Sequence, residues 1–295
     1  MGKKNFIDFI SERTRCIDGA MGTMLFKSGF QSGGCPELAP AEMIKKIHKS
    51  YLDAGAEIII TNTFGANRPK LEKYGLADRL KEINRRNAQI ACEIEFDEEF
   101  YVAGGLGPTG EFIEPYGEYT YAQFLEIFSE QVEALDSAGV DLIIIETMTA
   151  IEEFQAAIES AKKTTSLPVV ACMAFNKNPN GFFTMMGVSP LKMVQVAQQS
   201  GADIVGANCS LNPETMVELC EELVHISELP VIVEPNAGDP KLINGNTVYE
   251  PIPNLPEYLR RMVKLGVSII GGCCGTDPQY ISTLRKIVEQ EYYVV

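Results

Sequence analysis

Residues 138–146 read Ala-Gly-Val-Asp-Leu-Ile-Ile-Ile-Glu, and this short stretch contains the pattern that decides the fold. A helical pattern ends at Gly139, an aliphatic run begins two residues later, and a carboxylate ends the run. Near-continuous aliphatic composition is typical of strands that are buried on both faces. The same order recurs at Ser200-Gly201-Ala202 and at Leu265-Gly266-Val267. The stretch therefore predicts one unit of a chain in which helices and buried strands alternate.

Comparable aliphatic runs occur along the whole chain, and we interpret eight of them as strands of a parallel sheet. Amphipathic segments typical of helices separate these runs. Eight such units fit a (β/α)8 barrel, whereas an open doubly wound sheet would usually have fewer strands or a second domain. No linker interrupts the alternation, so we expect a single-domain α/β TIM barrel over residues 1–295. The expected strands are 15–17, 57–61, 101–103, 141–145, 169–175, 203–207, 231–233 and 268–270, and the expected helices are 41–52, 78–96, 121–137, 151–163, 191–199, 213–226, 255–265 and 278–289.

The composition indicates a folded domain and excludes several classes of partner. Hydrophobic residues make up 45% and charged residues 22% of the 295 residues, which are ordinary proportions for a globular protein. The formal net charge of −15 repels nucleic acids and anionic membrane surfaces. The cysteines are too sparse for a disulfide scaffold, no apolar run approaches the length of a membrane span, and the N-terminus lacks a signal-peptide pattern. We therefore expect a cytoplasmic protein with no nucleic-acid or membrane partner.

Polar residues and cysteines gather where the expected strands end, on the face at which such barrels form their active sites. Cys209 ends the sixth strand, and Cys273 and Cys274 end the eighth. Neighbouring residues of a strand point to opposite faces, so this pair can bind one ion only if the flanking glycines let the backbone leave strand geometry. Three thiolates with an open fourth position are typical of catalytic zinc, although the spacing alone fits inert or disulfide-forming cysteines equally well. The strand-end residues are Asp18, Asn62, Thr63, Gly105, Glu146, Asn176, Asn208, Cys209, Asn236, Cys273 and Cys274.

The two histidines and the other cysteines favour structural interpretations. His48 and His225 both fall inside expected helices of the outer ring, which argues against a Ser-His-Asp hydrolase and against a histidine-ligated metal. Neither Cys35, in a loop, nor the tail at residues 292–295 carries a pattern that assigns a role. The cysteines expected to pack as small apolar residues are Cys16, Cys92, Cys172 and Cys220.

Two carboxylates at the mouth of the expected barrel suggest a receptor for an ammonium group. Asp18 can simply favour a turn, and Glu146 can be a buried charge that backbone groups satisfy. Together, however, the two carboxylates would bind the amino group of an amino acid, and backbone N–H groups of the turn at 18–23 would take its carboxylate. The substrate-binding residues expected on this hypothesis are Asp18, Gly19, Ala20, Thr63 and Glu146.

The segment Gly105-Leu-Gly-Pro-Thr-Gly110 matches the glycine pattern of dinucleotide-binding loops. Pro115 and Gly117 occur where the required helix would run, and no suitably placed ribose-binding acid follows. We therefore interpret this segment as a glycine-rich active-site loop.

Seven motifs at these strand ends carry a resemblance to a known family: Asp18-Gly-Ala-Met-Gly-Thr-Met-Leu25, Thr61-Asn-Thr-Phe-Gly-Ala-Asn67, Gly107-Pro-Thr-Gly110, Glu146-Thr147, Ala207-Asn-Cys-Ser210, Pro235-Asn-Ala-Gly238 and Gly271-Gly-Cys-Cys-Gly-Thr276. They resemble the homocysteine-binding barrel of homocysteine S-methyltransferases, and most of all the N-terminal module of cobalamin-dependent methionine synthase. The resemblance covers nearly the whole chain. It implies a zinc enzyme in which a homocysteine thiolate attacks an activated methyl group to give methionine.

Transferred to this sequence, the resemblance implies that Cys209, Cys273 and Cys274 bind zinc, with Asn236 as an exchangeable fourth ligand. It also implies that Asp18 and Glu146 bind the amino group of homocysteine. The betaine-using branch of the family has a tyrosine near zinc where this chain has Gly65, which argues against betaine as the methyl donor.

The methyl donor is the open part of this interpretation. Neither histidine lies in an Asp-x-His-x-x-Gly motif of the kind that ligates cobalamin, and one barrel cannot also hold a corrinoid module. We therefore expect a methyl-corrinoid such as methylcobalamin to arrive on a separate protein or module. The alternative donor is a sulfonium, S-methylmethionine or S-adenosylmethionine, used by a self-sufficient enzyme. A more remote alternative is a non-enzymatic zinc or redox-sensing barrel.

Overall fold

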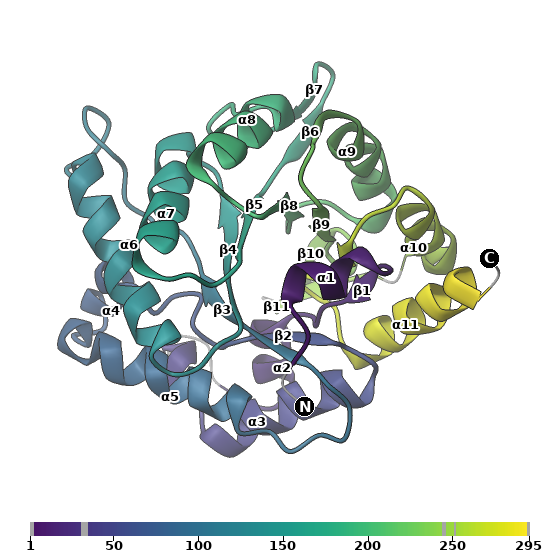
Figure 1. The fold of residues 1–295 in the computed structure, drawn as a ribbon, viewed down its shortest axis with the longest axis horizontal. Helices are drawn as coiled ribbons and strands as arrows, with labels where there is room; N and C mark the ends of the chain where they lie inside the picture. Colours follow the sequence, from purple (N-terminus) through teal and green to yellow (C-terminus); the bar gives the residue numbers. More distant parts are fainter. Residues whose placement is uncertain (1–2, 31–34, 244–245, 251, 294–295) are drawn as a thin grey trace.

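The computed structural model describes residues 3–30, 35–243, 246–250 and 252–293, which form a ring of helices around a central sheet (Figure 1). The strands of this sheet are β1 (Arg15–Cys16), β2 (Ile58–Ile60), β3 (Tyr101–Leu106), β4 (Leu142–Met148), β5 (Val169–Met173), β8 (Ile204–Asn208), β9 (Val231–Glu234) and β12 (Ile269–Ile270). All neighbours pair in parallel, in the order β1-β12-β9-β8-β5-β4-β3-β2. A bridge between Ile17 and Ile58 joins the first strand to the second. The predicted eight-stranded barrel is therefore confirmed.

Each expected helical segment forms a helix on the outside of this sheet. These helices are α3 (Ala41–Asp53), α5 (Leu80–Cys92), α6 (Tyr121–Asp136), α7 (Ile151–Thr164), α8 (Pro190–Ser200), α9 (Pro213–Ile226), α10 (Leu255–Lys264) and α11 (Pro278–Tyr293). The structure adds elements that the sequence did not predict, within the N-terminal segment and the loops. They are α1 (Phe6–Ser11), α2 (Met21–Lys27), α4 (Arg68–Glu72), two 3-10 turns (Pro36–Leu38 and Ala77–Arg79), and the hairpins β6 (Asn176–Asn178) with β7 (Gly181–Phe183) and β10 (Pro240–Ile243) with β11 (Asn246–Tyr249).

Helix boundaries follow from local capping chemistry. The side chain of Asn212 accepts from the Thr215 N–H at the start of α9, and Thr120 forms a reciprocal capping box at the start of α6. Gly201 ends α8 with a φ of 87°, a conformation that costs glycine no steric strain. The chain thus turns sharply from helix to strand, and each strand starts at the same edge of the barrel.

The barrel interior is apolar at its N-terminal end. Inward-facing residues such as Ile58, Leu142 and Ile232 form one buried cluster with Phe6 and Phe9 of α1. Helix α1 crosses the centre of the ring in Figure 1 and covers this end of the barrel. Because side chains and α1 fill the barrel at the N-terminal ends of the strands, a substrate can reach the interior only from the opposite end, where the strands terminate.

Candidate metal centre and substrate pocket

Three cysteines meet at the carboxyl ends of β8 and β12. The Sγ atoms of Cys209, Cys273 and Cys274 all lie within 4.8 Å of one another, and those of Cys209 and Cys274 are 3.8 Å apart. All three thiols are free. Strand β12 ends at Ile270, so the Cys273-Cys274 pair lies in a turn, where adjacent side chains can point the same way.

The backbone around the cysteines takes conformations that hold this arrangement. Cys209 has a φ of 62°, in the left-handed region that non-glycine residues seldom adopt. Gly275 has a φ of 83°, and a Cβ there would lie 2.3 Å from the Tyr249 ring. The Cys273 N–H donates to the Pro235 carbonyl at 2.8 Å. The cluster is therefore tied to the ends of three strands, β8, β9 and β12.

The three thiols of the cluster differ in the direction of their pKa shifts. Hydrogen bonds from Cys209 and Cys273 lower the pKa of the Cys274 thiol to about 3. For Cys209, the hydrogen bond with Cys273 lowers the thiol pKa, but the bond with Cys274 and burial outweigh it and raise the pKa to about 11. Hydrogen bonds with Cys209 and Cys274 raise the pKa of the Cys273 thiol. Of the three sulfurs, that of Cys274 therefore has the surroundings that most favour a thiolate.

Asn236 lies beside this cluster, two residues beyond the end of β9. Its side chain is buried, and its Oδ1 has no hydrogen-bond partner among the described residues. The backbone is held on both sides, because the Asn236 N–H donates to Leu211 and the Ala237 N–H donates to the carbonyl of Cys274, each at 2.9 Å. A buried carbonyl oxygen without a donor is costly to keep unless a ligand satisfies it.

The two predicted carboxylates lie within the same end of the barrel, where Asp18 is buried and Glu146 is half-buried. The Oδ2 atom of Asp18 accepts from the Ile60 N–H at 3.0 Å, whereas its Oδ1 has no partner among the described residues. Burial raises the pKa of Asp18 well above its usual value. Burial, and then the negative charge of Cys274, raise the pKa of Glu146 to about 8. A cation bound between these groups would stabilise both carboxylates.

A third carboxylate, Glu234, is also buried, and the sequence interpretation missed it. It is the last residue of β9, in register with Asn208 of β8, and its Oε2 has no partner within the described part of the chain. Burial and the charges of Glu146 and Asp18 raise its pKa. Its sequence signal matches that of Glu146, because each glutamate directly follows an aliphatic strand run. The candidate site therefore contains three carboxyl groups that influence one another.

Other strand-end residues are engaged within the protein. The Ala20 N–H donates to Thr276 Oγ1 at 3.1 Å, so this group of the predicted turn is occupied. A Cβ on Gly19 would lie 2.7 Å from the same oxygen. Thr63 donates to the Gly105 carbonyl at 2.8 Å and contacts the Thr61 hydroxyl at 2.6 Å, so its hydroxyl links β2 to β3. Asn176 does not join the site, because it lies exposed in the β6–β7 hairpin.

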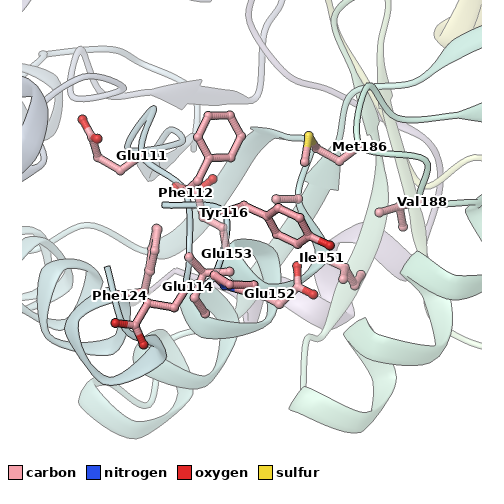
Figure 2. A pocket seen from close by; sticks show the side chains of 13 residues that line it. Glu111, Phe112, Glu114, Tyr116, Phe124, Ile151, Glu152, Glu153, Met186 and Val188 are labelled. Atoms are coloured by element: carbon pink, nitrogen blue, oxygen red, sulfur yellow. The ribbon is translucent and has the colours of Figure 1, made fainter. Parts of the chain in front are cut away.

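A separate cavity of about 420 Å³ opens on the same face, beside the loop after β3 (Figure 2). Phe112, Tyr116 and Met186 line it together with Glu114 and Glu152. None of the cysteines of the cluster and neither predicted carboxylate borders this cavity. The group of cysteines and carboxylates within the barrel is therefore a different feature of this face.

No described helix combines the length and apolar character that a bilayer span requires.

The chain is similar to known proteins over almost its whole length. Residues 15–288 match the family model described as homocysteine S-methyltransferase. The methionine synthases of Mycobacterium tuberculosis and Mycobacterium leprae are 29% and 28% identical to this chain over 305 aligned positions. These alignments cover 96% of the chain and 25% of each relative, so the chain spans about a quarter of their length.

Solved structures show the same fold. The metallated form of the homocysteine methyltransferase MmuM from Escherichia coli superposes with a TM-score of 0.79 at 23% identity, and the alignment covers 96% of this chain and 99% of that protein. A type I 3-dehydroquinate dehydratase from Clostridium difficile, at 14% identity and a TM-score of 0.55, shares only the general barrel. Because the family model matches nearly all of the sequence, this chain belongs to the homocysteine S-methyltransferase family.

Proposed function

We propose that this protein is a zinc-dependent homocysteine S-methyltransferase. The observation that carries the proposal is the convergence of Cys209, Cys273 and Cys274, with all three sulfurs within 4.8 Å of one another. Two thiolates bound to one tetrahedral zinc at the usual bond length lie about 3.8 Å apart, and the Cys209–Cys274 separation is 3.8 Å. Three sulfur donors also suit zinc better than a hard cation such as magnesium.

Asn236 would supply the fourth ligand when no substrate is present. Its unpartnered buried Oδ1 is a neutral donor, which a substrate sulfur can replace more readily than it could replace a fourth cysteine. When bound, zinc would supply Lewis-acid stabilisation of the homocysteine thiolate, whose parent thiol is otherwise mostly protonated at neutral pH.

The protein's own residues would bind and orient the rest of the substrate. Asp18 and Glu146 would accept hydrogen bonds from the ammonium group, and Glu234 adds a third negative site beside them. The raised pKa values support this assignment, because a bound ammonium group favours the ionised form of each carboxyl. Gly19, Ala20 and Thr63 would border the substrate without providing the main charged contacts.

The methyl group would come from a methyl-corrinoid on a separate protein or module. The support is that the mycobacterial relatives, of which this chain spans a quarter, are named methionine synthases. The thiolate would attack the methyl carbon, the bond from that carbon to the donor would break, and methionine would form. The neutral thioether of methionine would be a weaker donor than the homocysteine thiolate to a zinc ion held by Cys209, Cys273 and Cys274.

The test is a methylation assay with the purified zinc-loaded chain and homocysteine. Methylcobalamin, S-methylmethionine and S-adenosylmethionine are supplied separately, and methionine is quantified by mass spectrometry. We expect turnover with methylcobalamin and loss of turnover in Cys273→Ala. Turnover with a sulfonium alone would replace the corrinoid donor by the self-sufficient alternative. A chain that binds zinc but makes no methionine with any donor, and does not bind homocysteine, would instead fit a non-enzymatic zinc or redox-sensing barrel.

A further inference from the structure

The side chain of Asn208 joins two parts of the site that belong to different strands. It is the last residue of β8 and is fully buried. Its Oδ1 accepts from the Thr147 N–H at 2.7 Å, and its Nδ2 donates to the Thr147 Oγ1 at 2.9 Å. The same Nδ2 lies 4.0 Å from the Sγ of Cys273. One amide therefore contacts both the residue after Glu146 and a sulfur of the cysteine cluster.

Thr147 needs such a partner because of its backbone. Its φ is 59°, in the left-handed region that is a genuine outlier for a β-branched residue. The pairing of β4 with β5 is also irregular between Ile145 and Met148, which places Glu146 and Thr147 in the disturbed part of the strand. A strained conformation persists only where its surroundings hold it. The two hydrogen bonds between Asn208 and Thr147, one accepted and one donated by the Asn208 amide, provide that support.

We propose that Asn208 is a positioning residue that fixes Glu146 for the substrate's amino group and donates an N–H···S hydrogen bond to Cys273. The inference rests on the proposed function, because it assigns Glu146 and Cys273 the roles given there. The two hydrogen bonds between Asn208 and Thr147, which we call the Thr147 clamp, hold the backbone next to Glu146 and so fix where its carboxyl group points. The second Nδ2 hydrogen is directed toward a sulfur that would carry negative charge on a metal, and such outer contacts tune the ligand. The ammonium site and the thiolate site are thereby held in a fixed relation.

The selectivity for an amino group tests the first half of the proposal. The two ligands are homocysteine and 4-mercaptobutyrate, which has the same thiol and carboxylate but lacks the amino group. Calorimetry with the zinc-loaded protein gives the selectivity ratio, which is the Kd of 4-mercaptobutyrate divided by the Kd of homocysteine. We expect Asn208→Ala to reduce this ratio by about tenfold. Thr147→Val, which loses only the Oγ1 contact, should reduce it by a smaller factor.

A glycine at position 147 distinguishes a loss of Glu146 positioning from general damage to the fold. Glycine adopts a positive φ without strain, so it does not need the clamp. The double variant Asn208→Ala/Thr147→Gly should therefore regain most of the selectivity that Asn208→Ala loses. The matched control is Asn87→Ala, because Asn87 is a fully buried amide whose Nδ2 donates to the carbonyls of Glu37 and Ile83, neither of which is assigned to the site. This control should leave the ratio unchanged.

The second half of the proposal, the N–H···S hydrogen bond from Asn208 to Cys273, is tested in the cobalt-substituted protein. The measurement is the energy of the thiolate-to-cobalt charge-transfer band. A hydrogen bond to sulfur stabilises the electrons that this transition promotes, so Asn208→Ala should shift the band to lower energy. The shift should persist in the double variant, because glycine at position 147 restores no donor to Cys273. Should Asn208→Ala fold poorly, Asn208→Asp keeps the shape and the acceptor oxygen but loses both N–H contacts, and it should show the same band shift.

Two results would overturn the inference while leaving the proposed function intact. One is a wild-type protein that prefers homocysteine, combined with folded Asn208 variants that retain the full preference and an unchanged band. The other is a double variant that recovers nothing. A wild-type protein with no preference for homocysteine would instead contradict the proposed function itself.

Discussion

The Sγ atoms of Cys209 and Cys274 lie 3.8 Å apart, although 65 residues separate the two cysteines in the sequence. This separation matches the distance of about 3.8 Å expected between two sulfur ligands of one tetrahedral zinc. It arises because β8 and β12 both end on the same face of a closed barrel, with only β9 between them. The fold therefore builds a sulfur-rich site from strand ends, without a short cysteine motif.

Replacing Cys273 by alanine is expected to reduce bound zinc well below one equivalent, because two sulfur ligands and an amide hold the ion far less tightly than three sulfurs. Metal content after dialysis measures the effect. Cys92→Ala is the matched control, because Cys92 lies at the end of α5, where its thiol donates to the Gly139 carbonyl at 3.5 Å and contacts none of the three clustered cysteines. Equal zinc loss in both variants would argue against the assigned ligands.

Replacing a pocket carboxylate is expected to weaken homocysteine binding while zinc remains bound. Asp18→Asn and Glu146→Gln each remove a charged acceptor for the ammonium group, a loss of about 1.5–3 kcal/mol, or roughly 10- to 150-fold in Kd. Calorimetry measures the Kd, and metal analysis measures the zinc. Loss of zinc from either variant would contradict this division of roles.

The loop that carries the cysteine pair is expected to depend on Gly275. Alanine there would be strained at a φ of 83° and would also meet the Tyr249 ring, so zinc affinity should fall by about tenfold. Gly110 is a matched control, because its φ is 80° but a Cβ would meet nothing within 4 Å. Gly110→Ala should cost only about 1–2 kcal/mol of backbone strain and leave zinc affinity unchanged. A competitive chelator titration distinguishes the two results.

His48 is expected to make the fold sensitive to acid. It is fully buried in α3, neither ring nitrogen has a partner among the described residues, and burial lowers its pKa from 6.5 to about 4. The folded protein therefore keeps His48 neutral while the unfolded chain takes up a proton. Its stabilising contribution is complete above pH 6.5 and is lost as the pH falls toward 4, by up to about 1.4 kcal/mol per pH unit.

Urea unfolding of wild type, His48→Leu and His225→Asn across pH 7 to 4.5 tests this. The histidine at position 225 is exposed at the end of α9 and serves as the control. Between pH 6.5 and 4.5, His48→Leu should show a shallower loss of unfolding free energy than wild type. Parallel pH profiles for these two proteins would show that His48 is not responsible.

Most of the barrel could be predicted from the sequence because each unit carries its own local signals. The aliphatic run before Glu146 predicts a strand and Gly201 predicts a helix end, and neither depends on distant contacts. Helix α2 was missed because its N-terminal position, Ala20, has no capping side chain and its first turn contains Gly22. The exposed hairpins were missed because short strands without a buried face show no clear alternation.

The candidate site could be predicted only in part. The convergence of Cys209 with Cys273-Cys274 follows from the barrel, since all strand ends share one face. The contacts of Asn208 with Thr147 could not be predicted, because they depend on an unusual φ and on the registers of strands far apart in sequence. Glu234 was missed because the sequence interpretation ended that strand at Val233 and singled out Asn236 instead. Such positions depend on where side chains point, which the strand pattern does not determine.

The most direct test of the central claim is X-ray absorption at the zinc edge, on the purified protein with and without homocysteine. We predict three sulfur ligands and one light-atom ligand in the free protein, changing to four sulfur ligands when homocysteine is added. A coordination shell that still contains three sulfurs at saturating homocysteine would contradict the proposal that these cysteines hold zinc to activate the substrate thiol.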